Sequence, residues 1–599
     1  MKSSNLLIYF SYLRFFAKIG FFLFFAACFN DYKNQNPFLN NNIVVINPFY
    51  FQNLDGKNIP IKYFEEKNIA LKLAQNEQGF FSFLIYARKD LNKIKIEFDD
   101  LKSDQEKISK TAFDACLIKV WFQASNNSIT SSPGKKSLIP ELLLKDDSLI
   151  IVDEKKEQNF LRIKNREDRI EHINISEKEG VSFKKFNEAL VEDSKELKEL
   201  KEFSINKNRY KQIFVKVNLP AEVKSGIYYS KVKIYEGSNL YDEMPIQLQV
   251  INLSLPESDL IIGIFYEGIL SFSDHNDFGH KKKSPEQYEI ELRDIFNSGI
   301  MYPTFKEPPE KLGDAILVRR KIGFKLDKIF ITGTVDDFLA YPDKITEEKL
   351  LSKVDRYKDE IKKIASECEE IFISGYDEAS VYNKKIYILP ELYKKIKEKG
   401  VKIFCAISSY PGNFEIMKNI LDAPILMQKS YIQKKEDWLS EKNVLNEIKL
   451  YKGVGSIVLS YANPQVGIEN PELYRRNYGL GLFFYGYDGC MNFAYQRQFG
   501  KSIWNDFDAP LIKNKFYYRD HVFAYPIARG IISTIQYEGF KKGIIDLRYL
   551  KLLQSKLSEN KNEKKDELKN ELKNIQEKFL LSKDIYDDFE KLILKVLKQ

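Results

Sequence analysis

The hydrophobic pattern of this 599-residue chain changes at Pro256. Before it, from about residue 45, apolar and polar residues alternate with period two, as they do at Ile213, Val215 and Val217. Strands of an antiparallel sandwich alternate in this way because one face of each sheet is wet. The first half is therefore predicted to be an antiparallel β-sandwich over 46–256.

A dense run of charged residues interrupts this pattern at about 155–210. It includes a stretch near Phe183–Phe203 that is predicted to be helical. Charge runs of this kind are typical of solvated surface segments. We interpret 155–210 as a solvated insertion in the sandwich.

After Pro256, short apolar runs alternate with charged segments of helical period, such as Ser284–Asn297, Glu347–Cys368 and Leu389–Lys399. Eight buried strands that alternate with helices are typical of a (β/α)8 TIM-type barrel, whose chemistry lies at the C-terminal ends of the strands. The fold class is thus multidomain, β followed by α/β, with the barrel over 257–530 and a C-terminal helical region over 531–599. The predicted strands are Ile261–Tyr266, Gly299–Pro303, Lys328–Thr332, Ile371–Gly375, Val401–Ser408, Ile425–Gln428, Gly455–Tyr461 and Gly489–Tyr495.

The first 27 residues have the pattern of a signal peptide. They carry Lys2, Arg14 and Lys18 and no acid, and the apolar run from Ile19 to Ala27 follows. A run of this length is too short to span a membrane, which takes about 20 apolar residues. We expect the mature protein to be exported.

The residues Phe25-Ala26-Ala27 lie directly before Cys28 and resemble the lipobox of bacterial lipoproteins, in which the thiol is lipidated and becomes the new N-terminus. Phe25 departs from the usual leucine, and an ordinary secretory peptide is the alternative. The prediction is a protein of the bacterial cell envelope, lipid-anchored to a membrane through Cys28 and followed by a tether over 28–45. Two or more acyl chains hold a protein stably at a membrane surface, since each buried CH2 adds about 0.8 kcal/mol.

The composition excludes several classes of protein. The chain has 93 Lys and Arg against 85 Asp and Glu, and without its first 27 residues the net charge is 90 − 85 = +5, which argues against a nucleic-acid binder. Four histidines are too few for a His-rich metal site, and Asp274–Asp277 with His280 is interpreted as a polar loop. We expect no cofactor and no metal. The four cysteines after Cys28 are interpreted as small core residues: Cys116, Cys368, Cys405 and Cys490.

The strongest local signal for chemistry is the segment Ile371–Ser380. An apolar strand ends there in Gly375-Tyr376, and the carboxylates Asp377 and Glu378 follow at once. Two close carboxylates raise the pKa of one of them, which gives a protonated acid beside an ionised one. The alternative is structural: Asp377 caps the next helix, and Glu378 lies in its first turn.

Short motifs in a fixed order make the chain resemble family-123 glycoside hydrolases over about 60–550. That family consists of β-N-acetylgalactosaminidases with a sandwich before the barrel and an Asp-Glu pair at the end of the fourth barrel strand. The motifs are Asn76-Glu77, Phe80–Ala87, Leu138–Leu143, Phe214–Pro220, Gly226–Tyr228, Pro245–Pro256, Asp488-Gly489, Tyr525-Pro526 and Glu538–Leu550.

The resemblance implies removal of terminal β-linked N-acetylhexosamine from a carbohydrate or glycoconjugate. Glu378 would be the general acid/base, and Asp377 would orient the 2-acetamido group, whose carbonyl oxygen attacks the anomeric carbon. Such substrate-assisted catalysis retains the configuration and needs no enzyme nucleophile.

Two departures from the family leave other functions open. Ala379 stands where relatives often have Pro, and Gln536 stands where they commonly carry Arg, in a motif that we interpret as structural. A non-catalytic lipoprotein that binds glycans through a degenerate barrel is one alternative. A glycosidase of another linkage, which uses Glu267 with Glu378 as a conventional pair, is the other.

Further substrate-binding candidates lie near predicted strand ends. They include Tyr376 and Glu267, and a group of aromatic residues whose faces stack on sugars unless they only pack in the core. Arg475 and Arg476 contact either a sugar or a helix face, and the sequence leaves both open. The aromatic candidates are Tyr461, Tyr485, Tyr487, Tyr495 and Trp504.

Overall fold

The computed structural model describes residues 42–49, 68–125, 129–165, 167, 169–178, 189–191, 199–220, 222–271, 281–340, 345–382, 385–407, 412–427, 441–559, 564–581 and 584–597. The predicted signal peptide, Cys28 and the loop cluster at 274–280 lie outside these ranges. Within them, no helix combines the length and the apolar composition that crossing a bilayer requires.

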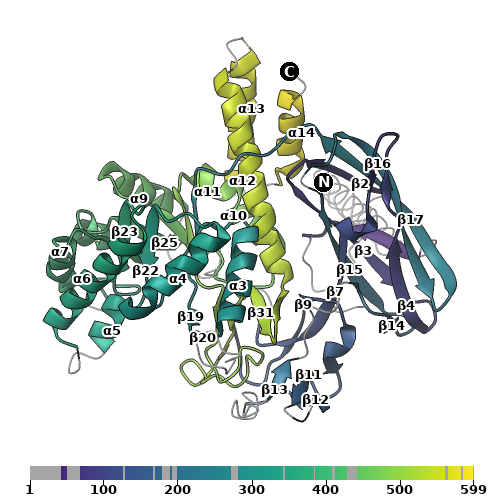
Figure 1. Ribbon diagram of the computed structural model, residues 1–599, viewed down its shortest axis with the longest axis horizontal. Helices are drawn as coiled ribbons and strands as arrows, with labels where there is room; N and C mark the ends of the chain where they lie inside the picture. Colours follow the sequence, from purple (N-terminus) through teal and green to yellow (C-terminus); the bar gives the residue numbers. More distant parts are fainter. Residues whose placement is uncertain are drawn as a thin grey trace, which may run out of the picture.

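Two sheets form the predicted sandwich, and Figure 1 shows them on the right. All pairs are antiparallel except β17 with β2. Side chains of both sheets, including Val215 and Val232, are buried in one cluster between them. The first sheet has the order β1 (Ile43–Ile46), β3 (Gln78–Tyr86), β15 (Tyr210–Asn218), β7 (Phe113–Gln123), β9 (Ser137–Leu144). The second has the order β14 (Phe203–Ile205), β4 (Leu91–Phe98), β16 (Gly226–Glu236), β17 (Asn239–Ile251), β2 (Ile69–Ala74), with β5 (Leu101–Lys102) and β6 (Lys107–Ile108) beside β16.

The charged insertion is a small sheet of its own: β10 (Ile150–Asp153), β11 (Gln158–Asn165), β12 (Ile170–Asn174) and β13 (Ala189–Val191). The predicted helix near Phe183–Phe203 is wrong in its described parts, because 189–191 pair with β11 and Phe203 begins β14. Pairing with an open strand edge outweighed the local helical pattern there.

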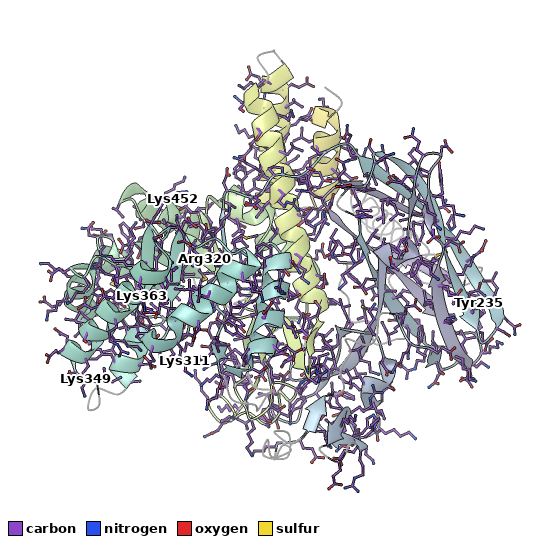
Figure 2. The ribbon with its side chains drawn as sticks, in the orientation of Figure 1. Tyr235, Lys311, Arg320, Lys349, Lys363 and Lys452 are labelled. Carbon is purple, nitrogen blue, oxygen red and sulfur yellow. The ribbon has the colours of Figure 1, made fainter. Side chains whose placement is uncertain are left out.

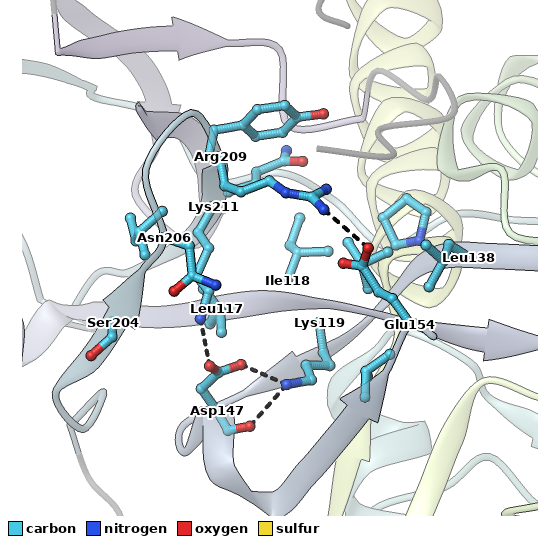
Figure 3. A pocket seen from close by; sticks show the side chains of 16 residues that line it. Leu117, Ile118, Lys119, Leu138, Asp147, Glu154, Ser204, Asn206, Arg209 and Lys211 are labelled. Carbon is cyan, nitrogen blue, oxygen red and sulfur yellow. Dashed lines mark hydrogen bonds and ion pairs between the residues drawn. The ribbon is translucent and has the colours of Figure 1, made fainter. Parts of the chain in front are cut away.

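Ion pairs tie the small sheet to the sandwich around a cavity of about 370 Å³ (Figure 3). Asp147 accepts from Lys119 at 2.8 Å and also pairs with Lys211, and Glu154 pairs with Arg209 at 3.0 Å. Leu161 and Ile163 of the insertion are buried in one cluster with Trp121. The insertion is thus packed on the sandwich as well as solvated.

Eight parallel strands form the barrel, and each overlaps one of the eight predicted strands. A parallel bridge between Phe305 and Ile331 joins the two ends of the sheet. The order is β21 (Tyr302–Pro303), β18 (Ile261–Ile264), β27 (Gly489–Asn492), β26 (Leu459–Tyr461), β25 (Ala423–Met427), β24 (Lys402–Ile407), β23 (Glu370–Ser374), β22 (Lys328–Ile331).

Amphipathic helices surround the barrel. Helix α6 begins after Thr346, whose hydroxyl accepts from the Lys349 backbone N–H, and it buries one side of the helix, including Val354 and Ile361. Its charged residues, such as Lys349 and Lys363, point outward in Figure 2. The helices are α3 (Pro285–Asn297), α4 (Pro309–Ile322), α5 (Thr334–Ala340), α6 (Glu347–Ile364), α7 (Leu389–Lys397), α8 (Asn413–Met417), α9 (Glu441–Gly453), α10 (Pro471–Asn477) and α11 (Leu480–Tyr485).

A hairpin of β31 (Ala524–Ile527) and β32 (Gly530–Ser533) crosses the predicted boundary between the barrel and the helical region, so residues 531–533 are strand where helix was predicted. Helices α12 (Ile535–Glu559), α13 (Lys564–Leu580) and α14 (Tyr586–Leu597) follow. Figure 1 shows α12 between the barrel and the sandwich, and Phe540 of α12 is buried in one cluster with residues of both. Gln536 is buried and donates to Glu141 of β9 at 2.6 Å, so this motif joins α12 to the sandwich.

Short strand pairs complete the described structure. They are β19 (Ile269–Leu270) with β20 (Lys282–Lys283), β28 (Gln496–Arg497) with β30 (His521–Val522), and β29 (Tyr517–Tyr518) with β8 (Thr130–Ser131).

Candidate active site

A cavity of about 470 Å³ opens at the C-terminal ends of the barrel strands. Most of its polar walls come from residues that end a strand or follow one closely, which is where barrel enzymes place their chemistry. These residues are Glu267 after β18, Lys306 after β21, Asp336 after β22, Asp377 and Glu378 after β23, and Tyr461 at the end of β26.

A bulge brings Asp377 and Glu378 to the same cavity. The Gly375 N–H donates to Phe404 O at 2.8 Å, and the next ladder bond runs from Glu378 N–H to Ala406 O at 3.1 Å. Three steps along one strand thus match two steps along β24, so one extra residue is inserted. Neighbours on a regular strand point to opposite faces, whereas these two carboxylates line one cavity.

The two N–H groups between these ladder bonds donate to side chains. The Tyr376 N–H donates to the Tyr393 hydroxyl at 2.6 Å, and the Asp377 N–H donates to Asp336 Oδ1 at 3.0 Å. Leaving such donors unpaired costs about 1–3 kcal/mol each, so both contacts hold the bulge in place. The helix-cap interpretation is wrong, because the next described α-helix is α7, whose N-cap position is Ile388.

The pKa of Asp377 is shifted from its usual value. Burial among the cavity walls, followed by the charges of Glu378 and Asp336, raises the pKa of Asp377 to about 7. Its carboxylate keeps access to solvent through the cavity mouth. A protonated carboxylate beside an ionised one was predicted, and the raised pKa of Asp377 favours the proton on Asp377 below about pH 7.

Tyr461 contacts the second carboxylate directly. Its hydroxyl donates to Glu378 Oε1. Burial and the nearby Glu378 charge raise the pKa of Tyr461 well above its usual value, so the phenol stays protonated and remains a donor. The contact fixes one oxygen of Glu378 at the cavity wall.

Glu267 lies in the same cavity between two cations. Its carboxylate pairs with Arg497, and Lys306 Nζ lies 3.8 Å from it. The side chain is largely buried. Buried charges of this kind persist when they are paired.

Two substrate-binding predictions need correction. Trp504 is buried against Trp121 and Tyr525, with ring centroids 6.2 Å and 4.7 Å away, and Tyr487 is buried in the core around the barrel. Neither lines the cavity. A buried ring cannot stack on a sugar without leaving its core, so these two residues are structural.

Tyr461 lines the cavity, whereas the other aromatic and arginine candidates lie outside its wall. Tyr495 is buried and donates to Asp294 at 2.9 Å, and Tyr485 packs against Phe579. Tyr376 is half-buried beside the cavity and packs against the core. The arginines bind the C-terminal helices: Arg475 pairs with Asp546 at 2.7 Å, and Arg476 donates to Phe579 O at 2.6 Å.

A strand that pairs with the first half of the chain contributes to one wall of the cavity, which the sequence did not indicate. Tyr518 lines the cavity on β29, and β29 pairs with β8 of the first half of the chain. The next residue, Arg519, is buried and pairs with Glu141 of β9 at 2.7 Å. Burial raises the pKa of Tyr518 to about 12, with a further effect of the Glu378 charge.

His521 is a second wall residue without a sequence signal. Its Nδ1–H donates to Val466 O, and burial lowers its pKa to about 3, so the ring is neutral near pH 7. Within the described ranges, no three or more His, Cys, Asp or Glu side chains gather as metal ligands do. Asp336, Lys306 and Arg497 were also missed, and only Asp336 and Lys306 carry a signal, as polar residues soon after a strand.

No protein-family model and no curated protein matches the sequence. The structure of a family 123 glycoside hydrolase from Clostridium perfringens, described for glycolipid glycan hydrolysis, is similar with a TM-score of 0.60. The two share 12% identity, over 93% of this chain and 98% of that one. At this identity the likeness establishes a shared fold, in agreement with the predicted sandwich and barrel.

A family 39 glycoside hydrolase from Bacteroides cellulosilyticus aligns with 12% identity over 58% of this chain and 75% of that one. Its TM-score of 0.32 is too low to bear on fold or function.

Proposed function

We propose that this protein is a glycoside hydrolase that removes terminal β-linked N-acetylhexosamine with retention of configuration, assisted by the acetamido group of the substrate. The observation that carries the proposal is the bulge after β23, which presents Asp377 and Glu378 together in a strand-end cavity of the barrel. The fold shared with the Clostridium perfringens enzyme supports it.

Each carboxylate has one role in this scheme. Asp377 accepts the acetamide N–H and holds the group beside the anomeric carbon. The acetamide oxygen then bonds to that carbon while the glycosidic C–O bond breaks, and Glu378 gives its proton to the leaving oxygen. In the second half of the reaction, Glu378 takes a proton from a water molecule, and the water oxygen attacks the anomeric carbon. This attack breaks the bond between the acetamide oxygen and the anomeric carbon and so opens the ring that the acetamide had formed.

The volume and the lining of the cavity suit a sugar. A volume of about 470 Å³ lies within the range of small-molecule sites. Phe265, Phe499 and Tyr518 add aromatic surface to its polar walls, and such surface packs on the C–H faces of sugars.

A panel of p-nitrophenyl N-acetylhexosaminides tests the proposal. Glu378→Gln and Asp377→Asn should each lower kcat by about 10³-fold or more. Glu391→Gln, an exposed acid on α7, is the control and should leave kcat unchanged. Turnover by the first two variants at the wild-type rate would remove both residues from the mechanism.

A thiazoline mimic of the cyclised acetamide should inhibit far more strongly than the free sugar, because it resembles the intermediate.

The competing function is glycan binding by a degenerate barrel. Binding on a glycan array without turnover of any bound glycan would favour that function.

We also propose that the protein works at the bacterial cell envelope, anchored through Cys28. The support is the sequence of residues 1–28 alone. Labelling with a fatty-acid probe should mark the wild type and leave Cys28→Ala unmarked. Release of an unlabelled wild type into the medium would favour an ordinary secreted protein.

A further inference from the structure

Asp336 is the third carboxylate on the wall that holds Asp377 and Glu378. Strand β22 ends at Ile331, and the left-handed φ of 78° at Gly333 turns the chain sharply into α5. Asp336 follows in the first turn of α5, beside the end of β23. The turn thus brings a second strand end to the carboxylate pair.

The contact between Asp336 and the bulge is specific. Asp336 Oδ1 accepts the Asp377 backbone N–H at 3.0 Å, so its carboxylate is held against the backbone of Asp377. The neighbouring Asp337 differs: its side chain is half exposed, it lies 3.8 Å from Lys353, and it is not part of the cavity wall.

We propose that Asp336 is a positioning residue that places the proton of the carboxylate pair on Asp377 in the free protein. The inference rests on the proposed function for its catalytic meaning. A proton on Asp377 leaves Glu378 as the acceptor of the Tyr461 hydroxyl, in agreement with their hydrogen bond.

The groups that face Asp377 from other elements agree with this placement. Tyr393 from α7, Cys405 from β24 and Tyr461 from β26 all have pKa values raised above their usual range by burial, and they are neutral near pH 7. Asp336 and Glu378 supply the negative charge that, after burial, raises the pKa of Asp377.

The cations Arg497 and Lys306 both lie against Glu267, another carboxylate of the cavity. Asp336 and Asp377 are like charges, and like charges favour the protonated form of one partner.

The placement has a consequence for substrate binding. An acetamide N–H needs an acceptor, so its binding favours the ionised form of Asp377. The Asp377 proton then passes to Glu378, which becomes the acid that the glycosidic oxygen requires. No proton enters or leaves the pair, so acetamide binding and the preparation of the acid are one event.

The test is the pH dependence of kcat/KM for a p-nitrophenyl N-acetylhexosaminide. In the active free enzyme the pair of Asp377 and Glu378 carries one proton. The fall of kcat/KM on the alkaline side of the pH profile therefore reports the loss of this proton from Asp377. Asp336→Asn keeps an oxygen acceptor for the Asp377 N–H but removes the charge. The alkaline limb should move down by about half a pH unit or more.

Asp337→Asn is the matched control and should leave the limb in place. A merely structural role for Asp336 would lower the rate equally at every pH. An Asp336→Asn profile that superimposes on the wild-type profile after scaling would therefore overturn the proposal.

A titration without turnover separates this inference from the proposed function. Aspartate carboxyls labelled with ¹³C are followed by NMR against pH, and Asp377→Asn identifies the Asp377 signal. The midpoint of that signal should fall in Asp336→Asn and stay in Asp337→Asn. If the midpoint falls in Asp336→Asn but the protein cleaves no N-acetylhexosaminide, the proposed function is wrong and the role of Asp336 stands. A midpoint that does not move in Asp336→Asn would overturn the role of Asp336.

Discussion

Gly375 and Tyr393 fit together because residue 375 has no side chain, and the Tyr393 hydroxyl occupies the place that a Cβ would take. The added carbon would also lie 2.9 Å from the Tyr393 ring and 3.0 Å from Cys405 Cβ, both closer than ordinary contacts. The same hydroxyl accepts the Tyr376 N–H. The fit therefore sets the position at which the strand leaves the ladder.

Gly375→Ala should displace the bulge and lower kcat by about 10²-fold, since a shift of about 1 Å at a catalytic group has that effect. Steady-state kinetics and a melting curve measure it. Gly453→Ala is the control, because nothing lies within 4 Å of its new Cβ. An alanine variant with unchanged kcat would show that the bulge does not depend on this fit.

Tyr461→Phe should lower kcat by about 10- to 100-fold, because it removes a hydrogen bond to a carboxylate, which is worth about 1.5–3 kcal/mol. Tyr487→Phe changes a buried tyrosine outside the cavity and should leave kcat unchanged. Equal kinetics of the two variants would contradict a catalytic contribution of the Tyr461 hydroxyl.

Asp377→Asn should stabilise the protein at alkaline pH. The pKa of this carboxyl is about 7 in the folded protein against a usual 3.8, so between these values the folded chain keeps a proton that the unfolded chain releases. Stability is lost as the pH rises through that window and stays low above it. Because Asp377 keeps access to solvent through the cavity mouth, we expect a gain of about 1–2 kcal/mol at pH 8 and almost none at pH 4.

Chemical unfolding at pH 4 and pH 8 measures this difference. Asp314→Asn, an exposed residue on α4, is the control and should show no such pH-dependent gain. A gain that is equal at the two pH values would contradict the assignment of the raised pKa to Asp377.

Glu267→Gln should lower kcat/KM by about tenfold, because it removes the carboxylate that pairs with Arg497 in the cavity. Glu267 as a covalent nucleophile, paired with Glu378, would instead make the loss many orders of magnitude. A trapped glycosyl-enzyme on Glu267, detected by mass spectrometry with a slow fluorinated substrate, would decide for that alternative.

Local patterns predicted the elements that local sequence controls. Each of the eight barrel strands is an apolar run bounded by turn residues, and burial on both faces produces such a run in any parallel sheet. The stretch near Phe183–Phe203 shows the opposite case: its described parts became strands because β11 and β4 offered open edges. Those edges lie far away in the sequence.

The candidate site divides in the same way. Asp377 and Glu378 were recognisable because they follow a buried strand directly. Arg497 and His521 were not, since the short pair β28 and β30 brings them to the cavity from residues beyond the last barrel strand. Trp504 also lies beyond the last barrel strand, but its side chain packs in the core beside Trp121.

The sequence alone thus determined the order of sandwich and barrel and the pair of acids at the fourth strand end, because period and adjacency are local properties. Only the tertiary structure decided that both acids share a cavity and that Asp377 has the raised pKa. The bulge depends on acceptors from α5 and α7, and the pKa depends on burial and on Asp336. Residues from separate strands and helices meet there, and no local pattern records their approach.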